Sequence, residues 1–138
     1  MTVAGSESFT ISTACIVSAE FILDIPKNRD ARTGNDGITL IVQGKILAAV
    51  GDDAPIDNTR QIALWSTVPS GRADCYRNVT LKNVRGKVVV REYNLPNAFV
   101  ADYRENFSDK AGVGTFTLKI KQKKERIEHV EVSGGYLD

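Results

Sequence analysis

Histidine, cysteine and metal-binding motifs are nearly absent from this chain. Its 138 residues include one histidine, His129, and two cysteines, Cys15 and Cys75, and no CxxC spacing occurs. A structural zinc site needs about four such ligands, so the composition does not support one. Two distant thiols in a chain without a secretion signal are expected to be small buried side chains. The sequence leaves open whether Cys15 pairs with Cys75.

Long apolar runs and a charge bias are also missing. The longest apolar stretches, Ile38–Val42 and Lys45–Val50, are far shorter than the roughly 20 residues that cross a bilayer, so we expect no membrane partner. The first residues, MTVAGSESFT, lack the basic and apolar regions of a signal peptide, which favours assembly in the cytoplasm. Lys and Arg number 18 and Asp and Glu 17, so the whole chain has no bias toward nucleic acid.

No catalytic or cofactor motif is recognisable either. HExxH and GxSxG are absent, and the glycines do not form a phosphate-binding loop. The single histidine lies on the parity opposite Val130 and Val132, which is typical of an exposed side chain. Asp36 and the pair Asp52–Asp53 lie in polar loops, where aspartates are usually solvated turn residues. We therefore expect no enzyme, no cofactor and no metal site.

Short β segments separated by polar, glycine-bearing loops occupy most of the chain. A first strand is predicted within Ser8–Val17, and a second in EFILDI, which Pro26 ends. The most apolar segment, Ile38–Val50, is interpreted either as one strand with a kink at Gly44 or as two strands. This succession indicates a β-rich protein.

The clearest local signal is a β-hairpin. YRNVTLKNV and KVVVREYNL flank Arg85–Gly86, where glycine supplies the positive φ of a tight turn, and Pro96 is expected to end the second strand. Ile62–Val68 fits a short helix or a strand, and Ala98–Phe107 also fits both periods. The pattern predicts one all-β domain over residues 1–138, a small antiparallel β-barrel or sandwich of about eight strands with one short helix.

A basic segment near the C-terminus, GTFTLKIKQKKERIEHVEV, shows period-two alternation in its first half. Its apolar side chains, from Phe116 to Ile120, are predicted to face the core, and Lys119, Lys121 and Lys123 to face solvent or a partner. The alternation fails near Lys123–Glu125, which predicts a polar turn between two strands. As an alternative function, Lys119–Arg126 could bind a protein partner or nucleic acid.

Several motifs in the second half of the chain together resemble a known family. They are ALWSTVP, CYRNVTLKNV, VVREYNLPNAFVADYRENF, GVGTFTLKIKQKK and the terminal SGGY, and they cover roughly Ile62–Tyr136. This pattern resembles short proteins from phage-like clusters of Gram-positive bacteria, some of which have been labelled membrane-associated protease. These proteins are similar to tube proteins of contractile injection systems, namely phage tail tubes and the haemolysin-coregulated protein (Hcp) of type VI secretion. No residues here support the protease label.

The resemblance implies a structural subunit without catalysis. It implies a compact β-barrel whose copies form a ring of six, with rings stacked into the inner tube of a phage particle or of a secreted or injected machine. Sheath, baseplate or cargo proteins would be its partners, and nucleic acid at most a passing cargo. In such a tube Lys119, Lys121 and Lys123 would face the channel or a partner.

Two further expectations concern contacts between copies. The long polar loop after Pro26 is a candidate for ring stacking, because stacking needs extensions that reach a neighbour, and Gly51–Gln61 is a second candidate. The residues proposed for the first loop are Asn28, Arg29, Asp30, Arg32, Asn35 and Asp36. Trp65 is expected in the core, with an interface anchor as the alternative.

Overall fold

A computed structural model describes residues 1–24, 37–47, 58–109 and 114–138. The strands are β1 (Thr2–Ala4), β2 (Phe9–Thr10), β3 (Ile16–Asp24), β4 (Gly37–Ile46), β5 (Arg77–Arg85), β6 (Val88–Phe107), β7 (Gly114–Gln122), β8 (Glu131–Ser133) and β9 (Tyr136–Leu137). The α-helix is α1 (Thr59–Ser66), and three short 3-10 helices, named η1, η3 and η4, are Thr13–Cys15, Ala73–Cys75 and Lys124–His129.

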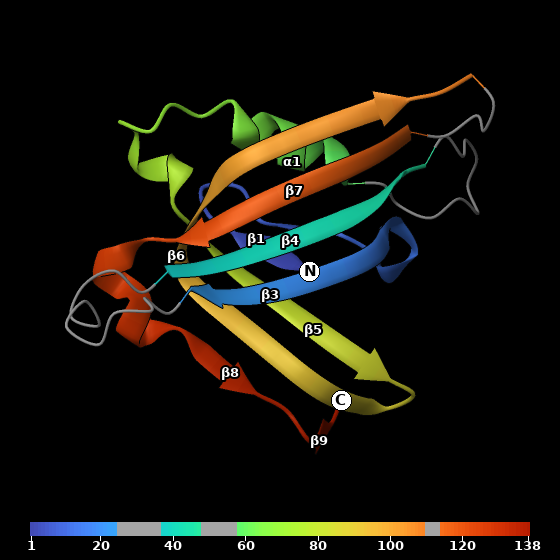
Figure 1. Cartoon of the computed structure of the whole chain (residues 1–138), viewed down its shortest axis with the longest axis vertical. Coiled ribbons are helices and arrows are strands. Elements are labelled where there is room, and N and C mark those ends of the chain that lie inside the picture. The colour runs from blue at the N-terminus through green and yellow to red at the C-terminus, as the bar shows by residue number, and fades with distance from the viewer. Residues whose placement is uncertain (25–36, 48–57, 110–113) are drawn as a thin grey trace.

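All nine strands belong to one antiparallel sheet (Figure 1), in the order β2-β1-β5-β6-β7-β4-β3, with β8 and β9 also paired to β6. The all-β prediction, with about eight strands and a short helix, is confirmed. The sheet is not closed into a barrel. Within the described residues, β2 pairs only with β1 and β3 only with β4, so the order has two ends.

The long strand β6 belongs to both halves of this sheet. Its first part, up to Ala98, pairs with β5, and its second part, from Ala98 to Phe107, pairs with β7. The prediction that Pro96 ends the strand is wrong. The register between β5 and β6 shifts between Arg77 and Val79, opposite Pro96, and proline is tolerated at such a bulge because no ladder hydrogen bond is lost there.

The core lies between the two halves of the sheet and under α1. Phe116, Leu118 and Ile120 of β7 are buried as the alternation predicts. Ile62 and Trp65 of α1 are also buried, which confirms Trp65 as a core residue, and the helical alternative for Ile62–Val68 holds as far as Ser66. Further core side chains come from β1, β2, β4 and β5 and include Val3, Phe9, Leu40, Val42, Val79 and Leu81. Cys15 and Cys75 are buried thiols.

Strand β4 continues through Gly44 without a break, so the one-strand interpretation holds as far as Ile46. Here glycine is required by a close approach. A Cβ atom on Gly44 would lie 2.1 Å from the carbonyl oxygen of Cys15 and 2.5 Å from the Phe116 ring. The backbone of η1 therefore packs directly on β4.

The hairpin of β5 and β6 is confirmed, with Gly86 at φ 64° in its turn. Ala98–Phe107 is a strand. The first predicted strand, within Ser8–Val17, is present only as β2 and the start of β3, and β1 was not predicted from sequence at all. A groove of about 690 Å³ lies between β3 and β5, and its walls include Phe21 and Tyr93, whose rings stack with centroids 4.4 Å apart.

Candidate assembly surfaces

Strands β3, β4, β7 and the second part of β6 form a four-stranded layer with one face turned away from the core. On β7 this outer face carries Thr117, Lys119 and Lys121, each partly exposed and alternating with buried residues. Lys119 lies between Ile41 of β4 and Asp102 of β6 in the register of the sheet. The structure thus places Lys119 and Lys121 on the solvent-accessible face of the layer, as the period-two pattern predicts.

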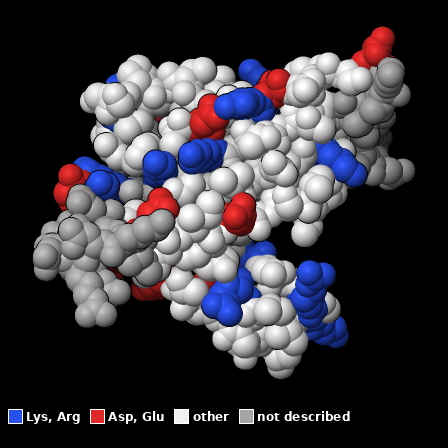
Figure 2. Space-filling model, in the orientation of Figure 1, with Lys and Arg blue, Asp and Glu red and all other residues white. Residues whose placement is uncertain are grey.

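The outer face is mixed in charge (Figure 2). The register adds Lys45, Arg104, Glu20 and Asp102 to the two lysines of β7. Arg104 Nε lies 3.2 Å from Asp102 Oδ2, so the charges of these two side chains offset each other. The face is therefore only weakly basic, and a surface of this kind lacks the strong positive field that dominates nucleic-acid affinity. Nucleic-acid binding by Lys119–Arg126 stays a prediction.

The basic run does not continue as a strand. β7 ends at Gln122, and Lys124 and Arg126 lie in η4, so the predicted polar turn near Lys123–Glu125 is confirmed. Lys123 Nζ lies 4.6 Å from the centroid of the Tyr76 ring, a cation–π distance. Lys123 is therefore held over an aromatic ring at the end of the layer and is not aligned with Lys119.

A pocket of about 410 Å³ opens at this end of the layer, and we call it the end pocket. Its walls include Tyr76, Phe99, Lys121, Lys123 and Lys124. Tyr76 and Phe99 meet edge to face, with centroids 5.9 Å apart. Gln122, also in the wall, is 3% exposed, and within the described chain its Oε1 accepts no hydrogen bond.

The two outer strands of the four-stranded layer have unpaired edges. Within the described residues, β3 pairs with no strand besides β4, and β6 beyond Ala98 pairs with none besides β7. Large apolar side chains are exposed on or beside these edges: Val17 and Leu23 on β3, and Leu64 on α1, which neighbours β6. Unpaired edges with exposed apolar groups are ready to pair with another chain.

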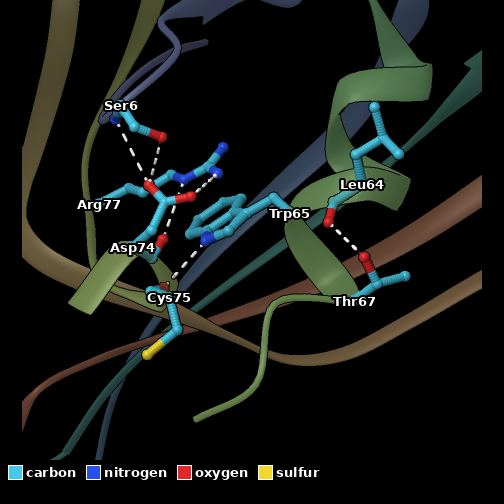
Figure 3. Close-up of polar contacts among 7 residues, drawn as sticks. All are labelled: Ser6, Leu64, Trp65, Thr67, Asp74, Cys75 and Arg77. Atoms are coloured by element: carbon cyan, nitrogen blue, oxygen red, sulfur yellow. Dashed lines mark hydrogen bonds and ion pairs between the residues drawn. The ribbon is translucent and has the colours of Figure 1, made fainter. Parts of the chain in front are cut away.

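A buried arginine fixes α1 and the N-terminal segment beneath the layer (Figure 3). Arg77 is 7% exposed, lies 5.5 Å from the centroid of the Trp65 ring, and donates from Nη2 to Asp74 Oδ2 at 2.8 Å. Ser6 Oγ donates to Asp74 Oδ1 at 2.8 Å, and Trp65 Nε1 donates to the carbonyl of Cys75 at 2.9 Å. These contacts join α1, η3 and the start of β5 to the N-terminal segment, which lies 68 residues away in sequence at Ser6.

Asp74 makes this junction sensitive to acid. Its hydrogen bond from Arg77, followed by that from Ser6, lowers the pKa of the Asp74 carboxyl from its ordinary value of 3.8. Because the folded-state pKa is the lower one, ionised Asp74 stabilises the fold above the unfolded-state pKa. That contribution disappears as the pH falls through the folded-state pKa.

We therefore expect Asp74→Asn to have a lower Tm than the wild type at neutral pH and the same Tm near pH 2, roughly the point where carboxylates in such pairs are protonated. Thermal unfolding followed by circular dichroism between these values tests this. Glu7→Gln serves as the control, because Glu7 is exposed and its carboxylate has no ion pair among the residues that the structure describes. A wild-type and an Asp74→Asn curve that stay equally far apart down to low pH would contradict the assignment.

Several sequence-based site predictions lie outside the described residues. They include all six residues proposed for ring stacking, Asn28, Arg29, Asp30, Arg32, Asn35 and Asp36, and also Asp52 and Asp53. His129 is exposed, as expected, but it ends η4 and does not lie on a strand. In the part of the chain that is described, no group of three or more His, Cys, Asp or Glu side chains could hold a metal ion, and no helix is long and apolar enough to cross a membrane.

The fold defined by this sheet and helix is shared with two solved structures. The structure matches Hcp1 from Flavobacterium johnsoniae with a TM-score of 0.56, at 12% identity, over 99% of this chain and 98% of that one. It also matches a chain of the six-fold symmetrised anti-feeding prophage baseplate, with a TM-score of 0.53, at 13% identity, over 96% and 90%. No family model and no curated protein matches. The predicted Hcp-like fold is confirmed.

Proposed function

We propose that this chain is a structural subunit whose copies form rings, and that the rings stack into the inner tube of a phage tail or contractile injection system. The fold shared with Hcp1 and with a baseplate chain supports this role, and the six-fold symmetry of that baseplate favours six copies per ring. The subunit acts by assembly and catalyses no reaction. Its partners are copies of itself and the sheath, baseplate or cargo proteins of the same machine.

The two unpaired edges of the four-stranded layer are the observation that carries the proposal. β3 runs antiparallel to β4, β4 to β7, and β7 to β6, so β3 and β6 also run in opposite directions. When β6 of one copy is placed beside β3 of the next, the new pair is antiparallel and the sheet continues unchanged. An interface between two different edges repeats from copy to copy, and it closes as a ring when the rotation from one copy to the next divides a full turn.

In this ring the outer face of the layer lines the channel. Lys119 and Lys121 would then point into the channel beside threonines and both acidic and basic side chains, and Lys123 would lie at its end. A channel of mixed charge holds neither sign of cargo firmly, which suits a conduit through which cargo must pass. The loop with Asn28, Arg29, Asp30, Arg32, Asn35 and Asp36 remains our candidate for contact between stacked rings.

The first test is the mass of the purified chain by light scattering after size exclusion. We expect a ring of about 90 kDa, six times the 15.1 kDa chain, and a ring-shaped outline in negative stain. A chain that stays monomeric up to its highest attainable concentration would contradict the proposal.

A further inference from the structure

An aromatic side chain stands exposed at the last residue of β6. Phe107 is 66% exposed, although it ends a strand whose partner β7 begins at Gly114 directly opposite. Its ring lies over Gly114, because a Cβ atom there would come within 2.5 Å of the ring. Glycine thus leaves room for the ring to lie in a fixed place, and Ser108 and the exposed Asp109 follow it. We call Phe107–Asp109 the β6 tip.

The end pocket lies at the opposite end of the same layer. Phe99, in its wall, precedes Phe107 by eight residues on one strand (107 − 99), which is roughly 25 Å at the rise of a β-strand. One copy therefore cannot insert its own tip into its own pocket. A second copy can do so when it is displaced along the direction of the strands.

The chemistry of the tip and that of the pocket are complementary. The pocket presents the rings of Tyr76 and Phe99 with a lysine over the first, an environment in which a third aromatic ring packs well. Three lysines, Lys121, Lys123 and Lys124, outnumber the two carboxylates in its wall, Asp24 and Glu125. A tip that carries an aromatic ring and an aspartate offers both the apolar group and the opposite charge.

We propose that the β6 tip of one copy binds the end pocket of a copy in the next ring, and that this contact stacks the rings. It is a head-to-tail contact between surfaces at opposite ends of the layer, so it displaces each copy along the direction of the strands and propagates along an axis without closing. The inference rests on the proposed ring. It assigns a stacking role to the β6 tip and the end pocket, whereas the sequence predicted this role only for two loops. Because every copy in a ring repeats the contact, a small loss in each copy is multiplied across the interface.

Single substitutions test the contact on rings whose mass is known. Phe107→Ser, and separately Lys123→Glu, should leave the ring mass unchanged and raise the protein concentration at which stacked rings appear in negative stain by about tenfold or more. Leu137→Ser and Lys87→Glu are the controls, because Leu137 is the most exposed large apolar side chain and both residues lie on the hairpin side of the fold. Both controls should stack like the wild type.

Mixing variants gives a sharper result. Phe107→Ser rings keep the pocket and lose the tip, whereas Lys123→Glu rings lose the pocket and keep the tip. At a protein concentration where the wild type just stacks, neither should stack alone, and a mixture should form pairs of rings that grow no further. In the double variant Asp109→Lys with Lys123→Glu, the exchanged charges should restore longer stacks.

Three outcomes would overturn the inference while leaving the ring proposal intact: wild-type rings that never associate, Phe107→Ser rings that stack normally, and mixtures that behave like their components. Phe107→Ser chains that are folded but no longer form rings would also overturn it, because they would place Phe107 in the contact within a ring. Absence of any wild-type ring is different, since it removes the proposed function itself.

Discussion

Replacing Gly44 by alanine is expected to lower the free energy of unfolding by about 2–4 kcal/mol, a large part of the total for a domain of this size. The added Cβ would lie 2.1 Å from the carbonyl oxygen of Cys15, a backbone atom that cannot rotate away. It would also lie 2.5 Å from atoms of the Phe116 ring. Relief requires that η1 and the start of β3 move off β4, which opens the core beneath them.

Urea unfolding measures this effect as a lower midpoint with an unchanged slope. Gly71→Ala is the matched control, because no heavy atom lies within 4 Å of a Cβ at that glycine. Its free energy of unfolding should change by about 0.5 kcal/mol or less. Equal midpoints for Gly44→Ala and Gly71→Ala would show that the contact between η1 and β4 does not exist as described.

Gly44 also marks a limit of sequence analysis in this protein. The glycine was recognised as unusual within an apolar strand, and a kink or a chain reversal was the available explanation. The real cause is the backbone of Cys15, which lies far away in sequence, and no local pattern contains that contact. Pro96 is a similar case. The rule that proline ends a strand is local, but the bulge that accommodates it is created by the register of β5.

Structural features that depend on a pattern within one segment were predicted well. The alternation of Phe116, Leu118 and Ile120 with lysines gave the correct face of β7, and Gly86 gave the correct hairpin turn. The short strand β1 was not predicted, because three residues are too few to show a periodic pattern. It exists because Val3 is buried against β5 and is aligned with Val79, a tertiary effect.

The candidate site was predicted only in part, for the same reason. Lysines on the outer face follow from period two, but an edge is defined by which strands fail to pair, and that is a property of the whole sheet. Val17 and Leu23 therefore look like ordinary apolar residues of a strand until β3 is known to end the sheet. The end pocket likewise needs Tyr76, Phe99 and Lys123 from three separate segments.

The double substitution Val17→Lys with Leu23→Lys is expected to convert rings into monomers. Both side chains are exposed, at 63% and 50%, so their loss should change the stability of a single copy by roughly 0.5 kcal/mol or less each. Lysine on an edge strand, however, is a strong obstacle to pairing, because joining the edges would bury its charge. The mass by light scattering should fall to that of one chain, with an unchanged circular dichroism spectrum.

A matched control separates edge pairing from loss of apolar surface in general. Val90→Lys with Leu137→Lys removes two side chains that are exposed at 44% and 77%, but from the hairpin side of the fold and away from both edges. These rings should persist. Monomers from both double variants would show that solubility, and not the edge, governs assembly.

The product of the edge variants also distinguishes two ways of using β3. Two copies could join β3 to β3 about a two-fold axis, which is antiparallel as well and stops at a dimer. In a ring, by contrast, both the β3 edge and the β6 edge of every copy are paired with a neighbour. Mixing the β3 variant, which keeps a functional β6 edge, with Ala101→Lys and Asn106→Lys on β6, which keeps a functional β3 edge, should yield a dimer of one copy of each and nothing larger. Two copies of the β6 variant that dimerise on their own would instead favour the β3 to β3 contact and end the case for the ring.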